Sequence, residues 1–191
     1  KVMAKDQNSI FMNLQGKDDR LSDESVQEIK KLPYVKSVFP LLLVKSPTSL
    51  ILTLIGRNFE TDTPLYAMDE EALIDIKDFK DNDNYIPIVV STGIMEIYNA
   101  GIAPSMGLPS MSKEMLTGLA MDIYFGYSSI FNIRGRESAV NRQGRVVGFS
   151  SRVPLTGITI TRKTLEKLKT LLPTPPGVNF VSLTVTADRP A

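Results

Sequence analysis

Residues 145–172, RVVGFSSRVPLTGITITRKTLEKLKTLL, decide the fold of this chain. Within them, residues 146–149 predict a buried strand, and residues 150–157 predict a polar turn that contains a proline. A β-branched run at residues 158–160 predicts a second strand, because such side chains pack well on a pleated sheet. The stretch then continues into a helix.

The start of that helix carries the clearest local signal in the sequence. Thr161 is placed to cap it through the side-chain hydroxyl, and Ile160 and Leu165 have the spacing of a hydrophobic staple. Leu165, Leu168 and Leu172 then recur at helical spacing. These residues predict a strand–turn–strand–helix unit, and none of them forms a catalytic motif.

Composition limits the classes of function. The chain has 191 residues, of which 42% are hydrophobic and 23% charged, as is typical of a folded protein with one domain or two small lobes. A net charge of +1 gives no electrostatic basis for binding nucleic acid. The lack of cysteine and histidine excludes disulfides, thiolate or histidine metal sites, and Ser-His-Asp catalysis. An enzyme of this composition would depend on carboxylates, lysine or tyrosine.

The sequence has no apolar run as long as a membrane helix. The longest runs, residues 38–44 and 50–55, are well short of the ~20 residues that a span needs. The chain begins at Lys1 without an initiator methionine or a signal peptide, which indicates a processed product or an excised domain. Membrane segments of a parent protein would then lie outside it.

The opening part of the chain resembles the closing part. Residues 9–14 alternate as in a strand, and Leu21 and Ser22 then precede a helix with the same spacing as in the closing unit. Both helices are followed by proline and by a strand, at residues 35–44 and 180–185. We expect an α+β fold in which the two β-α-β halves pair into one antiparallel-rich sheet, with both helices on one face.

The middle of the chain predicts short elements. Residues 86–90 predict a strand, and Ser91 is placed to cap a helix that ends near Gly101. Residues 103–109 are rich in proline and glycine and predict a loop. A second short helix begins after Ser112 and leads into a further strand.

Charge is divided between two blocks. Residues 60–83 hold nine acids against two lysines, a local charge of −7, and residues 134–169 hold nine bases against two acids, a local charge of +7. The blocks either face each other within the fold or mark separate faces. The arginines between residues 134 and 152 are candidates for binding phosphate or lipid headgroups, or they are ordinary surface charge.

Three motifs indicate catalytic or metal chemistry, and each has a simpler interpretation. Ser110 and Lys113 match the S-x-x-K pattern of serine β-lactamases, but the companion motifs are missing, and a helix cap explains the residues as well. Residues 81–84 begin like a calcium loop without its glycine and final glutamate, so a solvated turn is the alternative. The acids at residues 69–78 supply carboxylates for glycoside chemistry or form a solvated face. We expect no cofactor and no metal site.

Methionine is concentrated in one region. Five of the eight methionines fall between residues 95 and 121, among glycine, proline and serine. Methionine forms adaptable apolar surfaces, so the region is a candidate contact for a hydrophobic cargo or a partner protein. The candidate contact residues are Met106, Leu108, Met111 and Met115. The alternative is that these side chains fill gaps in the core.

Four short motifs carry a family resemblance. They are VVGFS at residues 146–150 with Pro154, Gly157 and Ile158 after it, LPYVKSVFP at residues 32–40, LIG at residues 54–56 and IVVS at residues 88–91. In this order they resemble the periplasmic core domain of MacB-type and FtsX-like ABC-transporter permeases. The chain differs from the family pattern in an insertion at residues 99–112, and it has no aspartate in residues 118–120, where the family commonly has one.

The resemblance implies a two-lobed α+β fold. Residues 1–58 and 144–191 would form a porter-like lobe with a β-α-β repeat, and residues 59–143 would form a small α/β lobe inserted into it. Such a domain lies outside the inner membrane and does no bond chemistry. It would couple ATP-driven movement of membrane helices to the export of a cargo or to a periplasmic partner.

The resemblance also implies partners. The parent protein would work as a dimer of permeases with a cytoplasmic ATPase, and it would engage a periplasmic adaptor or regulator. Two alternatives stay open, namely a free-standing extracytoplasmic binding module or lipoprotein, and an enzyme that uses carboxylates or a serine–lysine pair. A membrane helix before Lys1 and several after Ala191 in the parent gene would favour the permease.

Overall fold

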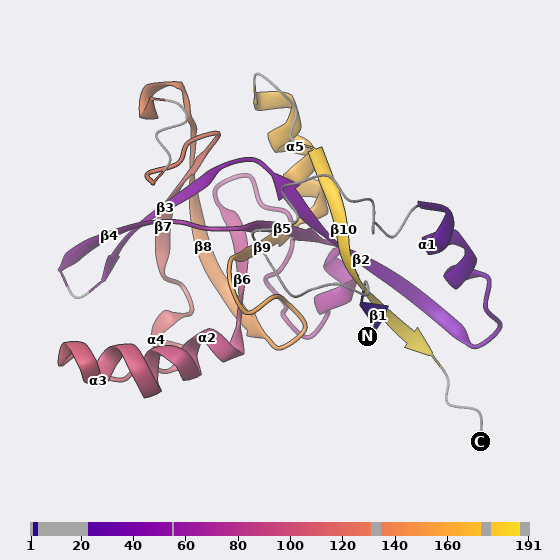
Figure 1. The fold of residues 1–191 in the computed structure, drawn as a ribbon, viewed down its shortest axis with the longest axis horizontal. Coiled ribbons are helices and arrows are strands. Elements are labelled where there is room, and N and C mark those ends of the chain that lie inside the picture. The colour runs from indigo at the N-terminus through magenta and orange to yellow at the C-terminus, as the bar shows by residue number, and fades with distance from the viewer. Residues whose placement is uncertain (1, 4–22, 55, 131–134, 173–176, 188–191) are drawn as a thin grey trace.

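A computed structural model describes residues 2–3, 23–54, 56–130, 135–172 and 177–187. In this part of the chain the strands form one ten-stranded mixed sheet, and short helices lie around it (Figure 1). The predicted α+β class is confirmed. None of the described helices has the length and apolar composition of a membrane span.

The strands are β1 (Val2–Met3), β2 (Val35–Lys45), β3 (Thr48–Leu54), β4 (Arg57–Asp62), β5 (Leu65–Met68), β6 (Ile86–Ser91), β7 (Ala120–Phe125), β8 (Val140–Ser150), β9 (Ile158–Thr161) and β10 (Gly177–Ala187). The helices are α1 (Asp23–Lys30), α2 (Thr92–Ile97), α3 (Ala103–Met106), α4 (Lys113–Leu116) and α5 (Arg162–Leu171). A π-helical turn, η3 (Tyr98–Ile102), joins α2 to α3, and the short 3-10 turns η2 (Glu70–Leu73) and η4 (Arg136–Ser138) precede β6 and β8.

The two ends of the chain meet in the sheet, whose strand order is β1-β10-β2-β5-β9-β6-β8-β7-β3-β4. The pairs β5–β9 and β6–β8 are parallel, and the other pairs are antiparallel. β10 pairs with β2 from Gly177 opposite Lys45 to Ala187 opposite Val35. The predicted pairing of the strands that follow the first and last helices is confirmed. The predicted strand at residues 9–14 lies outside the described residues.

Strand β5 is buried on both faces. Leu65 and Ala67 belong to one core together with Leu165 of α5, while Tyr66 and Met68 belong to a second core on the opposite face. Successive side chains of a strand alternate between faces, so a strand covered on both sides is apolar throughout. β5 therefore forms the centre of the fold.

The second core is covered by the connection between β5 and β6, residues 69–85. Leu73 and Phe79 in this connection are fully buried, and they pack with Leu41 of β2 and Val89 of β6. The acids of the connection are exposed or half-buried. Apolar side chains thus anchor the acidic block to the sheet, and its charges remain available for surface contacts.

The predicted start of α5 is confirmed. Thr161 Oγ1 accepts a hydrogen bond from the Thr164 backbone N–H at 3.0 Å. Ile160 and Leu165 are both fully buried in the first core, as expected of a hydrophobic staple. Leu168 is buried one turn later on the same side of the helix. Local sequence signals were sufficient to define this element.

The prediction that the helix after β6 ends near Gly101 is wrong. It continues through η3 into α3, so the first half of the predicted loop is helical. Pro104 lies in the first turn of α3, directly after the π-helical turn. The helix ends at Gly107, whose φ of 63° is left-handed, and the Leu108 N–H donates to the Ala103 carbonyl at 2.8 Å.

The predicted division into lobes stays a prediction. Strands from residues 1–58, 59–143 and 144–191 hydrogen-bond into the same sheet. β8 begins before the second predicted boundary, because its polar first half pairs with β7. The predicted helix start at Leu21 and Ser22 lies outside the described residues.

Candidate functional site

The acidic and basic blocks face each other. β5 and β9 run parallel and in register, so the residues that follow them, Asp69 and Arg162, leave the sheet side by side. Arg162 Nε lies 2.7 Å from Asp69 Oδ1, as an ion pair without a well-aligned hydrogen bond. At the next position of each chain segment, Lys163 Nζ lies 3.3 Å from Glu70 Oε2. The parallel register thus explains both contacts.

Further ion pairs extend this contact. Lys167 Nζ lies 2.7 Å from both Asp81 Oδ2 and Asp83 Oδ1. Hydrogen bonds to Asp81 and then to Asp83 raise the pKa of Lys167, and the same lysine lowers the pKa of Asp83. Arg152, in the turn after β8, pairs with Asp75. We refer to this set as the acid–base clamp, which comprises Asp69, Glu70, Asp75, Asp81 and Asp83 with Arg152, Arg162, Lys163 and Lys167.

The clamp joins the connection 69–85 to α5 and to the turn between β8 and β9. Most of its side chains are partly exposed, and exposed ion pairs stabilise a fold only slightly. Its main effect is therefore to fix the position of the connection, while the apolar contacts of Leu73 and Phe79 supply the stability.

Two of the arginines proposed as anion ligands, Arg136 and Arg145, have contacts within the fold, and Arg134 lies outside the described residues. Arg136 lies over the Tyr124 ring at 4.5 Å and lies 3.5 Å from Glu60 Oε1. Arg145 lies over the Tyr85 ring at 4.6 Å. These guanidinium groups fix neighbouring segments through ion-pair and cation–π contacts, which favours a structural role over a shared anion site.

Residues 81–84 form a turn. The Asn84 N–H donates to Asn82 Oδ1 at 2.8 Å, and the described residues contain no group of acidic side chains arranged to hold a metal ion. A cavity of about 130 Å³ lies between this turn, β8 and α5, with Tyr85 and Leu168 in its lining. A cavity of this size holds a group of roughly one aromatic ring. It is too small for a large cargo.

The S-x-x-K residues lie around a helix cap. Ser112 Oγ accepts a hydrogen bond from the Met115 N–H at 3.3 Å and caps α4. Ser110 lies before this cap, and both Ser110 and Lys113 are exposed. This arrangement agrees with the simpler of the two interpretations of the motif, namely a helix cap.

A helical arm, residues 92–116, is the most distinctive surface feature, and it comprises α2, η3, α3, a return segment and α4. Figure 1 shows α2, η3 and α3 as a rod that leaves the end of β6 and projects beneath β3, β4 and β7. The Asn99 side chain accepts from the Met111 N–H and donates to the Met111 carbonyl, both at 2.8 Å. The Tyr98 hydroxyl donates to the Pro109 carbonyl at 3.2 Å. Polar contacts thus hold the return segment against the rod.

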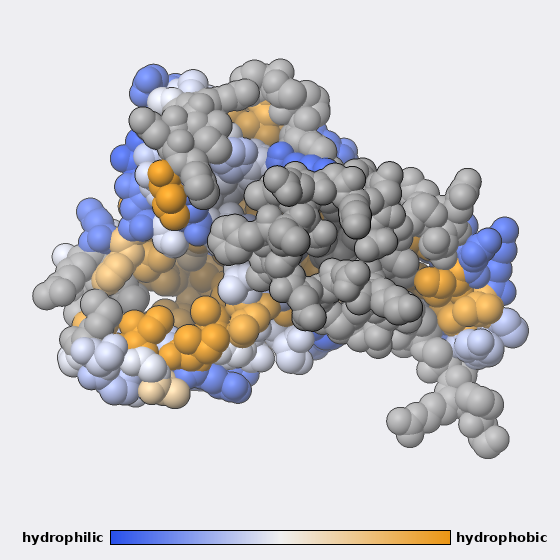
Figure 2. All heavy atoms as spheres, in the orientation of Figure 1, coloured by the Kyte–Doolittle hydropathy of each residue, from blue (hydrophilic) through white to orange (hydrophobic). Residues whose placement is uncertain are grey.

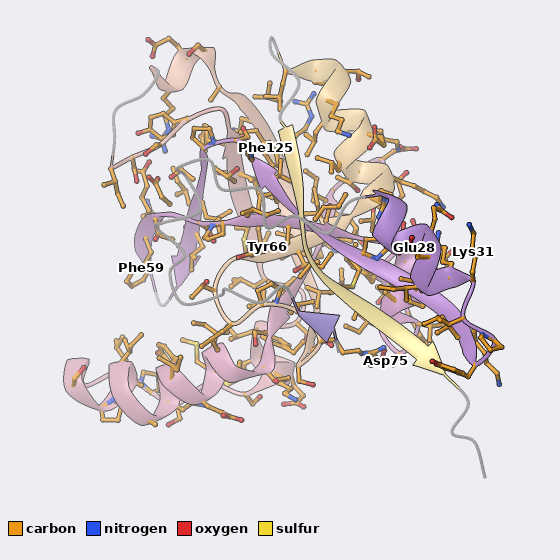
Figure 3. The ribbon with its side chains drawn as sticks, turned by 45° about the vertical axis from the view of Figure 1, so that its right-hand side comes forward. Glu28, Lys31, Phe59, Tyr66, Asp75 and Phe125 are labelled. Atoms are coloured by element: carbon orange, nitrogen blue, oxygen red, sulfur yellow. The ribbon has the colours of Figure 1, made fainter. Side chains whose placement is uncertain are left out.

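The arm exposes apolar side chains. Ile97, Ile102 and Met115 are 46%, 42% and 65% exposed. Figure 2 shows apolar residues on both sides of a hollow between the arm and the strands β3, β4 and β7. Phe59 of β4 lies on the strand side of this region (Figure 3). Grouped apolar side chains at a surface are typical of contact sites.

The four predicted contact residues differ in their surroundings. Met115 is exposed on α4, and Leu108 is half-buried. Met111 is only 6% exposed, so it supports the arm from inside. The side chain of Met106 lies outside the described part of the chain. Contact with a cargo or partner stays a prediction for these residues.

The predicted contact set lacks Ile97 and Ile102, because it was based on the concentration of methionine. A π-helical turn has more residues per turn than an α-helix, so residues five apart come to nearly the same face. The available signal was the apolar series Ile94, Ile97 and Ile102, which continues past the glycine.

A separate polar contact anchors the loop after β7. Asp62, in the last position of β4, accepts hydrogen bonds from the Ser129 N–H and hydroxyl at 2.7 Å each and from the Ile130 N–H at 3.2 Å. The Ser128 hydroxyl donates to the same carboxylate. Burial alone raises the pKa of Asp62, but the hydrogen bonds from Ser128, Ser129 and Ile130 outweigh burial and bring the pKa below its usual value.

Comparison with protein families assigns the chain to a class. The model of the PCD-like family, described as "Probable transporter periplasmic core domain", matches residues 2–165. The chain belongs to this family. It is an extracytoplasmic domain on the periplasmic side of a transporter, and the family is one of transport domains rather than enzymes. The predicted family and localisation are confirmed.

Comparison with individual proteins adds one solved structure. The chain is similar to the periplasmic region of MacB from Actinobacillus actinomycetemcomitans, with a TM-score of 0.38 and 16% sequence identity, over 94% of this chain and 71% of that chain. None of the curated proteins compared with the chain matches it.

Proposed function

We propose that this chain is the extracytoplasmic domain of an ABC-transporter permease. It does no bond chemistry itself. It passes the ATP-driven movement of membrane helices in its parent protein to an exported cargo or to a periplasmic partner. The match of residues 2–165 to a transporter periplasmic core domain is the observation that carries this proposal. The parent works as a dimer with a cytoplasmic ATPase and engages a periplasmic adaptor or regulator.

The sheet supports a mechanical role. β10 is linked through β2, β5 and β9 to β6, and the helical arm begins at the end of β6. Close-packed cores deform little and transmit displacement. A movement applied to β10 would therefore reach the arm as a rigid-body displacement. The acid–base clamp links the connection 69–85 to α5 and so limits internal sliding.

We assign the contact with cargo or partner to the helical arm. Ile97, Ile102 and Met115 provide an apolar surface without catalytic groups, as a non-catalytic contact requires. Met106 and Leu108 extend this assignment along the arm, and Met111 supports it from inside. The flexible methionine side chains would let the surface adapt to more than one shape.

The first test is the hydropathy of the parent open reading frame. One membrane span before Lys1 and several after Ala191 would support the permease. A lipobox or a simple signal, with no spans on either side, would contradict it and would leave a free-standing binding module as the function.

The second test addresses the arm in the full parent protein. A strain that lacks the parent gene is complemented with the triple variant Ile97→Ser, Ile102→Ser, Met115→Ser. A matched control changes Ile74→Ser and Leu171→Ser, which are exposed apolar residues outside the arm. We expect the triple variant to lose complementation at normal protein level and the control to keep it. Equal results for the two variants would contradict the assignment.

A further inference from the structure

A second exposed surface lies at the turn between α1 and β2, on the other side of the molecule from the helical arm (Figure 1). Residues 30–36 read KKLPYVK, and we refer to them as the basic tip. Lys30 is the last residue of α1, Lys31 follows it, and a leucine, a proline and a tyrosine continue the turn.

Backbone hydrogen bonds define the shape of the tip. The Lys31 N–H donates to the Glu28 carbonyl at 3.1 Å. The Leu32 N–H donates to the Ile29 carbonyl at 3.2 Å, and the Val35 N–H donates to the Leu32 carbonyl at 3.0 Å. The backbone of the tip is thus a tight, hydrogen-bonded turn.

Two apolar side chains of the tip, Leu32 and Tyr34, are exposed, whereas Val35 packs inward. Leu32 and Tyr34 are 41% and 53% exposed, although Val26 and Val38 form a buried cluster directly behind the turn. Lysines near the C-terminus of a helix interact favourably with the negative end of its dipole. That effect does not account for an exposed leucine and tyrosine beside them.

Exposed charges of both signs lie at this end of α1. Figure 3 shows Lys31 at the outer end of the helix, with Glu28 one turn earlier. Figure 2 shows an apolar patch bordered by hydrophilic residues over α1 and the start of β2. Lys30 and Lys31 are both exposed and precede Leu32, so positive charge lies beside the exposed apolar side chains of the tip.

Both ends of the described chain lie near the tip. Ala187, the last residue of β10, pairs with Val35, next to Tyr34. β1 pairs with the same strand, Val2 opposite Leu183. The four residue steps from Leu183 to Ala187 span roughly 13 Å. Chain segments that continue from either end therefore start close to the basic tip.

We infer that the basic tip docks on the surface of an anionic phospholipid bilayer. This inference rests on the proposed function, because membrane spans that continue from β1 and β10 would bring the tip to the membrane surface. Lys30 and Lys31 contact lipid phosphates, Leu32 enters the acyl region, and Tyr34 lies at the interface, where amphipathic aromatic rings are favoured. Docking at this point would set the angle of the rigid domain relative to the membrane.

The chain contains no tryptophan, so Tyr34→Trp creates a single fluorescent reporter at the tip. The full chain, with a C-terminal hexahistidine tag, is tethered through nickel-chelating lipid to phosphatidylcholine vesicles with or without about one third phosphatidylglycerol, because tethering raises the local concentration of a weak contact. On the anionic vesicles we expect a shift of emission to shorter wavelength, and brominated acyl chains should roughly halve its intensity.

Two matched controls isolate the tip. Ile74→Trp places the same reporter at another strongly exposed apolar position, and its emission should not change. Lys30→Glu with Lys31→Glu, added to the reporter chain, should abolish the shift and the quenching. Lys77→Glu with Lys80→Glu, which changes two exposed lysines outside the tip, should leave both intact. Leu32→Trp is a second reporter if Tyr34→Trp does not fold.

The outcomes are distinct. Absence of quenching on the anionic vesicles, equal quenching at Ile74→Trp, or equal quenching on vesicles without phosphatidylglycerol would each overturn the inference. A parent gene without membrane spans would overturn the proposed function and would not alter the vesicle result. Failure of the membrane-docking inference is therefore distinguishable from failure of the proposed function.

Discussion

The region around β5, β9 and α5 and the helical arm are built in different ways. In the first region, apolar side chains such as Leu65 and Leu165 are buried between packed layers. In the arm, polar contacts of Tyr98 and Asn99 hold the return segment, and large apolar side chains remain exposed. The difference indicates that one region supplies the stability of the domain and the other supplies a surface for contact.

The largest expected effect tests the first region. Leu165→Ala removes a fully buried side chain and leaves a cavity, so we expect the free energy of unfolding to fall by about 4 kcal/mol. Leu171→Ala, on the exposed side of the same helix, should lower it by less than about 0.5 kcal/mol. Urea denaturation measures both values. Similar losses would show that α5 does not pack as described.

A glycine pair compares backbone constraint in the two regions. Gly157 has a φ of 95°, and an added Cβ would meet the Pro64 carbonyl oxygen and the Tyr66 ring, so Gly157→Ala should cost about 3 kcal/mol. Gly107 in the arm has a φ of 63° with open space around it, so Gly107→Ala should cost about 1 kcal/mol. Equal losses in urea denaturation would contradict the close packing at Gly157.

Local signals predicted the first region well. The cap at Thr161 and the staple of Ile160 and Leu165 involve residues within one helical turn, so their chemistry can be read directly from the sequence. The register of β5 with β9 depends on residues about ninety positions apart. For that reason the sequence left open whether the charge blocks meet, although both were evident from composition.

The arm was predicted less well. Gly101 and Pro104 are strong local signals for a helix end, but η3 passes the glycine and Pro104 falls in the first turn of α3. The contact between Asn99 and Met111 joins residues whose proximity depends on that continuous rod. The exposed tip at Leu32 and Tyr34 could not be identified from an apolar motif alone, because burial depends on the packing of the whole domain.

The polar contact in the arm gives the next expected effect. Asn99→Ala removes both hydrogen bonds to Met111 and leaves its backbone groups without these partners, at a cost of about 1.5 kcal/mol. The loss should be local, so amide hydrogen exchange should accelerate at residues 107–112 and stay unchanged in β5. Asn58→Ala removes one exposed hydrogen bond to Thr53 and serves as the control. Acceleration in β5 as well would mean that the two regions unfold together.

The loop anchor at Asp62 predicts a dependence on pH. A carboxyl whose folded pKa is lowered stabilises the fold at pH values above its unfolded pKa of about 3.9, and this contribution is lost as pH falls through the folded value. Asp62→Asn should therefore cost about 1 kcal/mol at neutral pH and little at an acidic pH at which the Asp62 carboxylate is protonated. Exchange of the Ser129 and Ile130 amides, measured at both pH values, gives the test. Protection that does not change between them would contradict the anchor.

The smallest expected effect concerns Lys167 in the clamp, where one ammonium lies between Asp81 and Asp83. Its raised pKa means that its contribution is present below its unfolded pKa of about 10.4 and is lost only at more alkaline pH. On the acid side, the lowered pKa of Asp83 means that the contribution fades as that carboxylate is protonated. Lys167→Gln should thus lower Tm slightly at neutral pH, and the difference should vanish in acid and in ~1 M salt, which screens exposed charges. Lys77→Gln changes an exposed lysine outside the clamp and should not change Tm. A loss of Tm at Lys167→Gln that does not depend on salt would mean that the aliphatic stem of Lys167, rather than its charge, holds the connection to α5.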